Sequence, residues 1–174
     1  MSNNFAGFGP SLRGSRLLAI GLGGALLLWP HVGGAQSEGP FLTFDGNWRG
    51  SGRVTGDDGK TERITCRASY SVPPSGMALS QSLVCASDSY RFEVQSDVVA
   101  TDGHTVQGRW AEKTRGAQGD LIGDVSAGQF NGSVSGTGFT AEISIKTTGR
   151  KQVVMIVPHG STVTKVDVVM SRDG

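Results

Sequence analysis

Apolar and polar residues alternate along most of the chain after residue 44, in short runs that glycine-rich turns interrupt. The alternation is clearest between residues 61 and 72, where every second residue from Ile64 onward is apolar. A period of two places successive side chains on opposite faces of a strand, so each run predicts a half-buried strand. No stretch after residue 40 has a helical period of useful length. The runs predict strands over residues 45–55, 61–72, 78–86, 90–100, 120–125, 129–135, 139–146, 152–157 and 162–171, with one more directly after Gly103.

These strands follow one another through short turns, and no long connection interrupts them. An all-β chain of sequentially paired strands closes most simply as an antiparallel up-and-down β-barrel, because closure removes exposed strand edges. We therefore expect an all-β barrel of about eight to ten strands. A two-sheet β-sandwich is the alternative that the same pattern allows.

Cys66 and Cys85 are the only cysteines, and they flank a predicted turn at residues 73–76. Pairing the two strands so that Cys66 faces Cys85 brings nearly all their apolar residues onto one face. The same register sets Ala68 against Leu83, Tyr70 against Gln81 and Val72 against Leu79. The pattern predicts a β-hairpin stapled by a disulfide, worth about 3 kcal/mol in the chain-entropy account. Two separate buried thiols are the alternative.

A second hairpin is predicted at Thr101-Asp102-Gly103, a three-residue loop with Gly103 in the left-handed conformation. This loop length pairs Val98 with Val106 and Val94 with Trp110. The inward-facing residues of the flanking strands then share one face.

The first 35 residues have the pattern of a secretory signal peptide. Arg13 and Arg16 precede the uncharged apolar stretch 17–29, and small residues lead to a cleavage site after Ala35. This stretch is shorter than the roughly 20 residues that span a bilayer, so no stable membrane insertion is expected after cleavage. We expect the mature protein in the periplasm or secreted, where disulfides form.

Residues 36–43 are expected to form a flexible leader, and residues 44–174 a single barrel domain. The whole chain has 16 Lys plus Arg and 15 Asp plus Glu, with no basic run. This balance argues against a nucleic-acid partner. We expect neither a metal site nor a cofactor, and the serine and histidine residues form no convergent catalytic set.

Gly46-Asn47-Trp48 resembles the Gly-x-Trp start of the first strand in the calycin barrels, which include lipocalins, avidins, fatty-acid-binding proteins and some small exported protease inhibitors. The resemblance covers about nine residues, from Phe44 to Gly52. It implies that Trp48 plugs one end of the barrel and that an arginine from a late strand packs across it. Arg172, at the end of the last predicted strand, is the matching candidate. Trp48 as a simple core aromatic is the alternative.

Trp48-Arg49-Gly50-x-Gly52 also resembles the start of the nitrobindin haem barrels, which need an axial histidine. After signal cleavage only His104 and His159 remain, both in or beside predicted turns. A haem or tetrapyrrole binder is therefore the third of our functional hypotheses.

Large apolar residues on the inward parity of the strands could form either a packed core or the lining of a pocket. They are Ile64, Tyr70, Leu83, Phe92, Trp110, Phe130 and Phe139. The leading hypothesis is an exported, non-enzymatic barrel that binds a small apolar ligand. The second is a periplasmic protein-partner binder or protease-inhibitor-like barrel, with the leader 36–43 as an arm inserted into a partner.

Glycines interrupt several of the predicted strands or lie beside them, at positions 50, 52, 108, 123, 128 and 132. Glycine weakens a strand, so its presence there indicates a bend, a bulge or a close backbone approach. A cavity wall cleared for a ligand is the alternative explanation.

Overall fold

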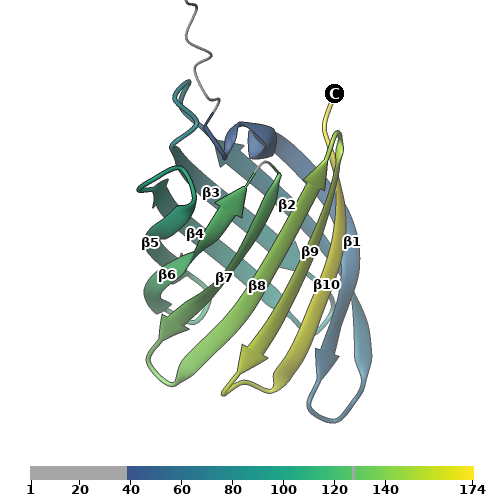
Figure 1. The fold of residues 1–174 in the computed structure, drawn as a ribbon. Helices are drawn as coiled ribbons and strands as arrows, with labels where there is room; N and C mark the ends of the chain where they lie inside the picture. Colours follow the sequence, from purple (N-terminus) through teal and green to yellow (C-terminus); the bar gives the residue numbers. More distant parts are fainter. Residues whose placement is uncertain (1–38, 127) are drawn as a thin grey trace, which may run out of the picture. The chain divides into compact units, whose positions relative to one another are not determined.

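The structure is a computed structural model that describes residues 39–126 and 128–174. The predicted signal peptide, residues 1–35, and the first part of the predicted leader lie outside the described residues. Ten strands form one closed antiparallel barrel in the order β1-β10-β9-β8-β7-β6-β5-β4-β3-β2 (Figure 1). The strands are β1 (Gly46–Gly56), β2 (Thr61–Ser71), β3 (Ala78–Ala86), β4 (Arg91–Ala100), β5 (Thr105–Glu112), β6 (Ala117–Ser126), β7 (Gln129–Gly136), β8 (Phe139–Thr148), β9 (Lys151–His159) and β10 (Val163–Arg172).

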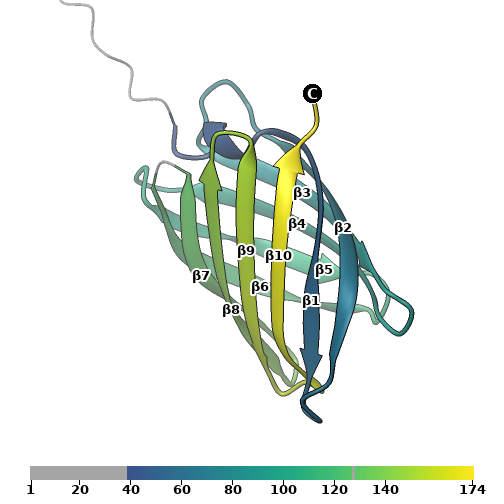
Figure 2. The same cartoon turned by 90° about the vertical axis from the view of Figure 1, so that its right-hand side faces the viewer.

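The predicted up-and-down barrel is confirmed. Every strand pairs with its neighbours in sequence, and β1 closes the ring by pairing with β10. Figure 2 shows these two strands side by side. The closed ring rules out the two-sheet sandwich. The one helical element among the described residues is η1 (Leu42–Phe44), a 3-10 turn before β1. None of the described helical residues forms a helix with the length and apolarity needed to cross a membrane.

The cysteine hairpin is confirmed, and Cys66 on β2 is disulfide-bonded to Cys85 on β3. Two further predicted pairs, Ala68 with Leu83 and Tyr70 with Gln81, also stand opposite one another. The fourth pair lies beyond the end of β2, where the backbone N–H of Val72 donates to the Asp45 carboxylate at 3.0 Å. Because disulfides persist in oxidising compartments, this bond indicates an oxidising location such as that of exported proteins.

The predicted register of the β4–β5 hairpin is wrong by two residues. Val98 faces Gly108 rather than Val106, and Val94 faces Glu112 rather than Trp110. The turn is wider because the Asp102 carboxylate accepts the backbone N–H groups of His104 and Thr105, at 2.9 and 2.6 Å. Gly103 does adopt the left-handed conformation, with φ of 82°. A shift of two preserves the period-two alternation, so the predicted inward face is unchanged.

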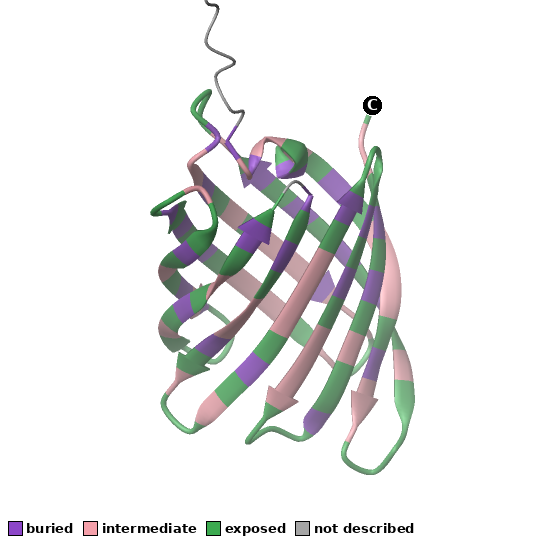
Figure 3. Ribbon diagram, viewed as in Figure 1, coloured by how far each residue is buried: buried purple, intermediate pink, exposed green. Residues whose placement is uncertain are grey.

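Buried and exposed residues alternate along the strands (Figure 3). The buried apolar residues form one core cluster in the barrel interior. Several inward positions are glycines, and a side chain there would meet a neighbouring strand. A Cβ on Gly50 would overlap the Val169 backbone oxygen of β10, and one on Gly52 would overlap that of Asp167. At these two positions glycine therefore permits close approach of β1 and β10.

Residues 39–45 cover the end of the barrel at which β1 begins and β10 ends (Figure 1). Phe41 is 2% exposed, and its N–H donates to the Gly76 carbonyl in the β2–β3 turn at 3.1 Å. The described part of the predicted leader, residues 39–43, is thus packed on the barrel. Phe44, also 2% exposed, accepts a hydrogen bond from the Trp48 indole at 2.8 Å through its carbonyl oxygen.

Trp48 and Arg172 stand opposite one another on β1 and β10. The Arg172 guanidinium lies 4.7 Å from the centre of the Trp48 ring, within the range of a cation–π interaction. Its Nη2 also donates to the Thr43 carbonyl at 2.6 Å. Gly46 has φ of 108°, which favours glycine at this position, and the Arg172 side chain passes over it. Arg172 therefore ties the covering segment to the last strand.

Candidate ligand-binding cavity

The barrel encloses a cavity of about 230 Å³. This is far more than the roughly 15 Å³ that a water molecule requires, and it approaches the lower end of ligand pockets, about 300 Å³. The seven large apolar residues singled out in the sequence all line it: Ile64, Tyr70, Leu83, Phe92, Trp110, Phe130 and Phe139. The disulfide also forms part of the wall through Cys66 and Cys85.

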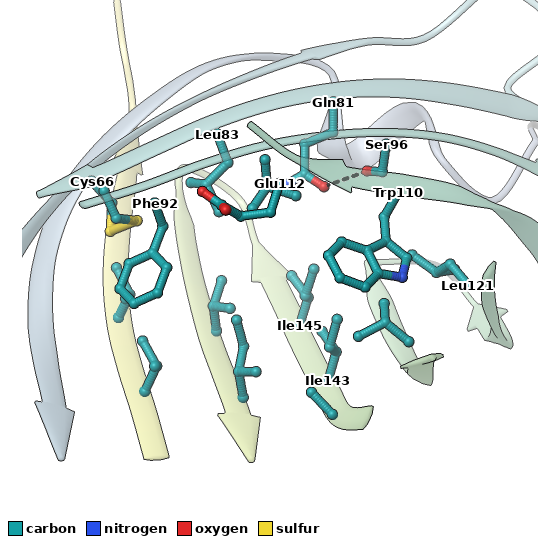
Figure 4. Close-up of a pocket in the computed structure, with 18 of the residues that line it drawn as sticks. Cys66, Gln81, Leu83, Phe92, Ser96, Trp110, Glu112, Leu121, Ile143 and Ile145 are labelled. Atoms are coloured by element: carbon teal, nitrogen blue, oxygen red, sulfur yellow. Dashed lines mark hydrogen bonds between the residues drawn. A yellow bond between two sulfur atoms is a disulfide. The ribbon is translucent and has the colours of Figure 1, made fainter. Parts of the chain in front are cut away.

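The middle of the barrel is hollow rather than filled by its own side chains. Inward-facing Ile143 and Ile145 on β8, Ile156 on β9 and Val166 on β10 are only partly buried. These four residues line the cavity. Figure 4 shows the β8 isoleucines on one side, with side chains such as Leu83 and Trp110 on the other. An apolar ligand in this space would cover apolar surface that the folded chain leaves open.

Two aromatic rings lie close to the glycines of β6 and β7. Gly123 and Gly132 are paired on these strands. A Cβ on them would lie 2.9 and 2.6 Å from ring atoms of Phe130. Trp110 lies close to Gly136, since a Cβ on Gly136 would lie 3.2 Å from the Trp110 ring. The indole N–H of Trp110 donates to the Ser135 carbonyl at 3.2 Å. The glycines at 123 and 132 thus give an aromatic ring room at the wall, which keeps the centre open.

The covered end of the cavity has an apolar floor and a small buried polar network. Phe41 and Phe44 line the cavity there. The Tyr70 hydroxyl donates to Gln152 Oε1 at 3.0 Å, and Gln152 Nε2 donates to Thr147 Oγ1 at 3.1 Å. Burial raises the pKa of Tyr70 above its usual value, so the phenol remains a neutral donor at physiological pH. These bonds satisfy buried polar groups without aiming a charge at the cavity.

The opposite end of the cavity is bordered by aromatic and cationic side chains. The lining reaches Pro158 and Ser161 at the β9–β10 turn. Phe92 lies there with two neighbours: Tyr90 stacks on it with ring centres 6.1 Å apart, and the Arg115 guanidinium lies 4.9 Å from its ring centre. Both ring contacts hold Phe92 in place at this end of the wall.

Three polar side chains of the lining, Gln81, Ser96 and Glu112, come from β3, β4 and β5. The Ser96 hydroxyl donates to Gln81 Oε1 at 2.8 Å (Figure 4). Glu112, which is 7% exposed, accepts backbone N–H groups from Glu93 and Thr114 at Oε1 and from Arg115 at Oε2, at 3.1, 3.0 and 2.7 Å. Burial raises the pKa of Glu112, but hydrogen bonds from the Thr114 hydroxyl and from the backbone outweigh it and hold the pKa below its usual value. Glu112 is therefore ionised at neutral pH.

Sequence reasoning missed Glu112 and Phe41 among the lining residues. Glu112 shares the inward parity of Trp110 and Val106 on β5, so alternation alone could have placed it in the interior. Phe41 precedes the first strand, and no periodicity assigns it a face.

A haem would need an axial ligand inside the cavity. His104 lies in the β4–β5 turn at the covered end, and His159 ends β9 at the other end. Both side chains are exposed, and neither lines the cavity. The two histidines of the described chain therefore do not fit haem ligation in this interior. Across the described residues, no cluster of three or more His, Cys, Asp or Glu side chains could hold a metal ion.

No protein-family model matches the sequence, and no curated protein matches it significantly. Solved structures that resemble the fold include the following two. Rv2717c from M. tuberculosis has a TM-score of 0.58 and 9% sequence identity, with 76% of this chain and 94% of that chain covered. The S-type phycobiliprotein lyase CPES from Guillardia theta has a TM-score of 0.53 and 13% identity, with 77% and 90% covered. Both are β-barrel proteins of the calycin-like, lipocalin-type fold, and at these identities the likeness extends to the fold alone.

Proposed function

We propose that this protein is an exported, non-enzymatic barrel that binds a small apolar molecule in its interior. The observation that carries the proposal is the hollow centre. Apolar side chains from β8, β9 and β10 face a space of about 230 Å³ inside the barrel instead of packing against the opposite wall. Burying such surface is the main driving force for apolar ligand binding.

The arrangement of the two ends supports a binding role. Residues 39–45 and the Trp48–Arg172 contact cover one end, so a ligand would enter from the end bordered by Phe92. The export part of the proposal rests on the disulfide and on the signal pattern before Ala35. The second hypothesis, a partner-binding arm, gains no support from Phe41, which is buried in the covered end.

Titration with N-phenyl-1-naphthylamine, a neutral apolar dye that brightens in apolar surroundings, tests the proposal directly. We expect saturable binding to the wild type. Ile143→Trp would fill the cavity from β8 and should abolish the signal. Ile122→Trp is the matched control, because Ile122 is 61% exposed on the outer face of β6 and its replacement should leave dye binding unchanged.

Two results would count against the proposal. Dye binding that is lost equally in both tryptophan variants, or in neither, would place the dye outside the barrel. Native mass spectrometry of protein purified from its own host provides the second check. We expect a chain beginning near residue 36 with an added small-molecule mass, whereas an uncleaved chain would refute export.

A further inference from the structure

The polar side of the cavity carries a negative charge that no basic side chain of the described lining balances. Glu112 is the one charged residue among the described residues that line the cavity. Its three backbone hydrogen bonds hold the carboxylate in place but leave its net charge unchanged. In Figure 4 the carboxylate lies on the wall beside Leu83 and Phe92, among apolar side chains.

Two arginines at this end of the barrel, Arg115 and Arg91, are engaged elsewhere. The Arg115 guanidinium lies over the Phe92 ring, and its Nη1 donates to the Arg91 carbonyl at 3.2 Å. Arg91 forms an ion pair with Glu93. Both arginines are exposed, so water and salt screen their charges, whereas Glu112 is 7% exposed and is screened less.

We infer that the cavity discriminates by charge: it accepts apolar molecules whose polar end is cationic or a neutral hydrogen-bond donor, and it rejects carboxylic acids such as fatty acids. This inference rests on the proposed function and names its ligand class. An anionic end would lose water and meet a second carboxylate, with no arginine or lysine of the described lining to pair with it. An ammonium or hydroxyl end would instead find Glu112, and the hydrogen-bonded pair of Gln81 on β3 and Ser96 on β4 also lines the cavity.

The test compares three ligands that share one chain: octylamine, octan-1-ol and octanoate, each displacing N-phenyl-1-naphthylamine at pH 7. Octylamine and octanoate carry opposite unit charges, so a purely apolar cavity would disfavour both for the same reason. We expect octylamine to bind roughly ten- to a hundredfold more tightly than octanoate, the range of one hydrogen bond to a charged group. Octan-1-ol supplies the neutral reference.

Glu112→Gln tests the residue assignment, because it removes the charge with little change in size. The amine-to-acid ratio should fall toward one in this variant. Glu142→Gln makes the same change at an exposed position on the outer face of β8 and should keep the wild-type ratio. Since Glu112 also holds the β5–β6 turn, thermal melting checks that the Glu112→Gln variant is folded. The amine-to-acid affinity ratio of the wild type tests the charge selection without this variant.

The outcomes separate the inference from the proposed function. If the dye and all three ligands bind but octanoate competes as well as octylamine, the barrel binds ligands and the charge selection is wrong. If Glu112→Gln is folded and keeps the wild-type ratio, the assignment to Glu112 is wrong. If neither the dye nor any octyl compound binds the wild type, the proposed function fails and this inference fails with it.

Discussion

Breaking the Cys66–Cys85 disulfide should destabilise the barrel by an amount that follows from the length of chain it closes. The two residues are separated by 19 positions and stand opposite one another on β2 and β3. In the chain-entropy account a loop of this length restricts the unfolded state by about 3 kcal/mol. For a domain of this size each kcal/mol shifts Tm by roughly 3–4 °C, so we expect reduction to lower Tm by about 10 °C.

The measurement is thermal unfolding of the wild type with and without reductant, followed by circular dichroism. Thiol titration in denaturant confirms that both cysteines are free in the reduced sample. Reduced wild type keeps both sulfur atoms in the wall, so the comparison isolates the cross-link from the packing of the side chains. The double variant Cys66→Ala, Cys85→Ala is the control, and its Tm should not respond to reductant.

A fully reduced wild type that melts within about 2 °C of the oxidised protein would refute this reasoning. It would mean that the β2–β3 ladder already restricts the unfolded or partly folded chain as strongly as the cross-link does. A response to reductant in the alanine variant would show that the reductant acts on something other than this disulfide.

Three further changes test separate features of the wall. Gly132→Ala should destabilise the barrel by about 1–3 kcal/mol in urea unfolding, because the new Cβ would overlap the Ile122 backbone oxygen and lie 2.6 Å from the Phe130 ring; an unchanged midpoint would contradict the close packing. Hydrogen bonds from Thr105 and His104 hold the pKa of Asp102 at about 2, against an ordinary value of 3.8. The free energy of unfolding that Asp102 contributes is therefore fully present above pH 3.8 and is lost as the pH falls to about 2. Asp102→Ala should therefore flatten the loss of stability over this window, and an acid titration of the variant that parallels the wild type would contradict it. Arg63 stands opposite Arg53, and Arg63→Glu would turn this like-charge pair into a pair of opposite charges. The variant should be more stable than the wild type by about 0.2–1 kcal/mol at low salt, and this gain must shrink in high salt if its origin is electrostatic.

The inside-outside alternation of the strands could be predicted from the sequence because a period of two is a local property. The Cys66–Cys85 pair then fixed one register, since any shift by one residue would have turned the apolar face of β2 outward. The β4–β5 register could not be derived in the same way. A shift by two residues keeps every side chain on its face, and the wide turn depends on how Asp102 accepts hydrogen bonds from the backbone.

The apolar part of the candidate site was predicted from the sequence, whereas its polar part was missed although alternation gives Glu112 an inward parity. Aromatic and aliphatic residues of inward parity, such as Phe92 and Phe130, point to the interior whether it is filled or hollow. An inward acidic residue such as Glu112 is unexpected from its chemistry, and it is tolerated because three backbone N–H groups from β4 and the β5–β6 turn meet it. Those donors become apparent only once the chain is folded.

The hollow interior has two independent causes in this chain. A barrel of about eight strands is just wide enough for its own side chains to fill it, and the diameter grows with strand number, so ten strands enclose more space. Filling that space would require large inward residues, yet Gly50, Gly52, Gly123 and Gly132 occupy inward positions. At β6 and β7 the glycines also let Phe130 lie against the wall instead of across the centre. Strand number sets the width of the interior, and the glycines leave that width unfilled. A Cβ at Gly123 or Gly132 would push the Phe130 ring toward the centre, whereas one at Gly50 or Gly52 would meet the backbone of β10 and strain the closure of the barrel.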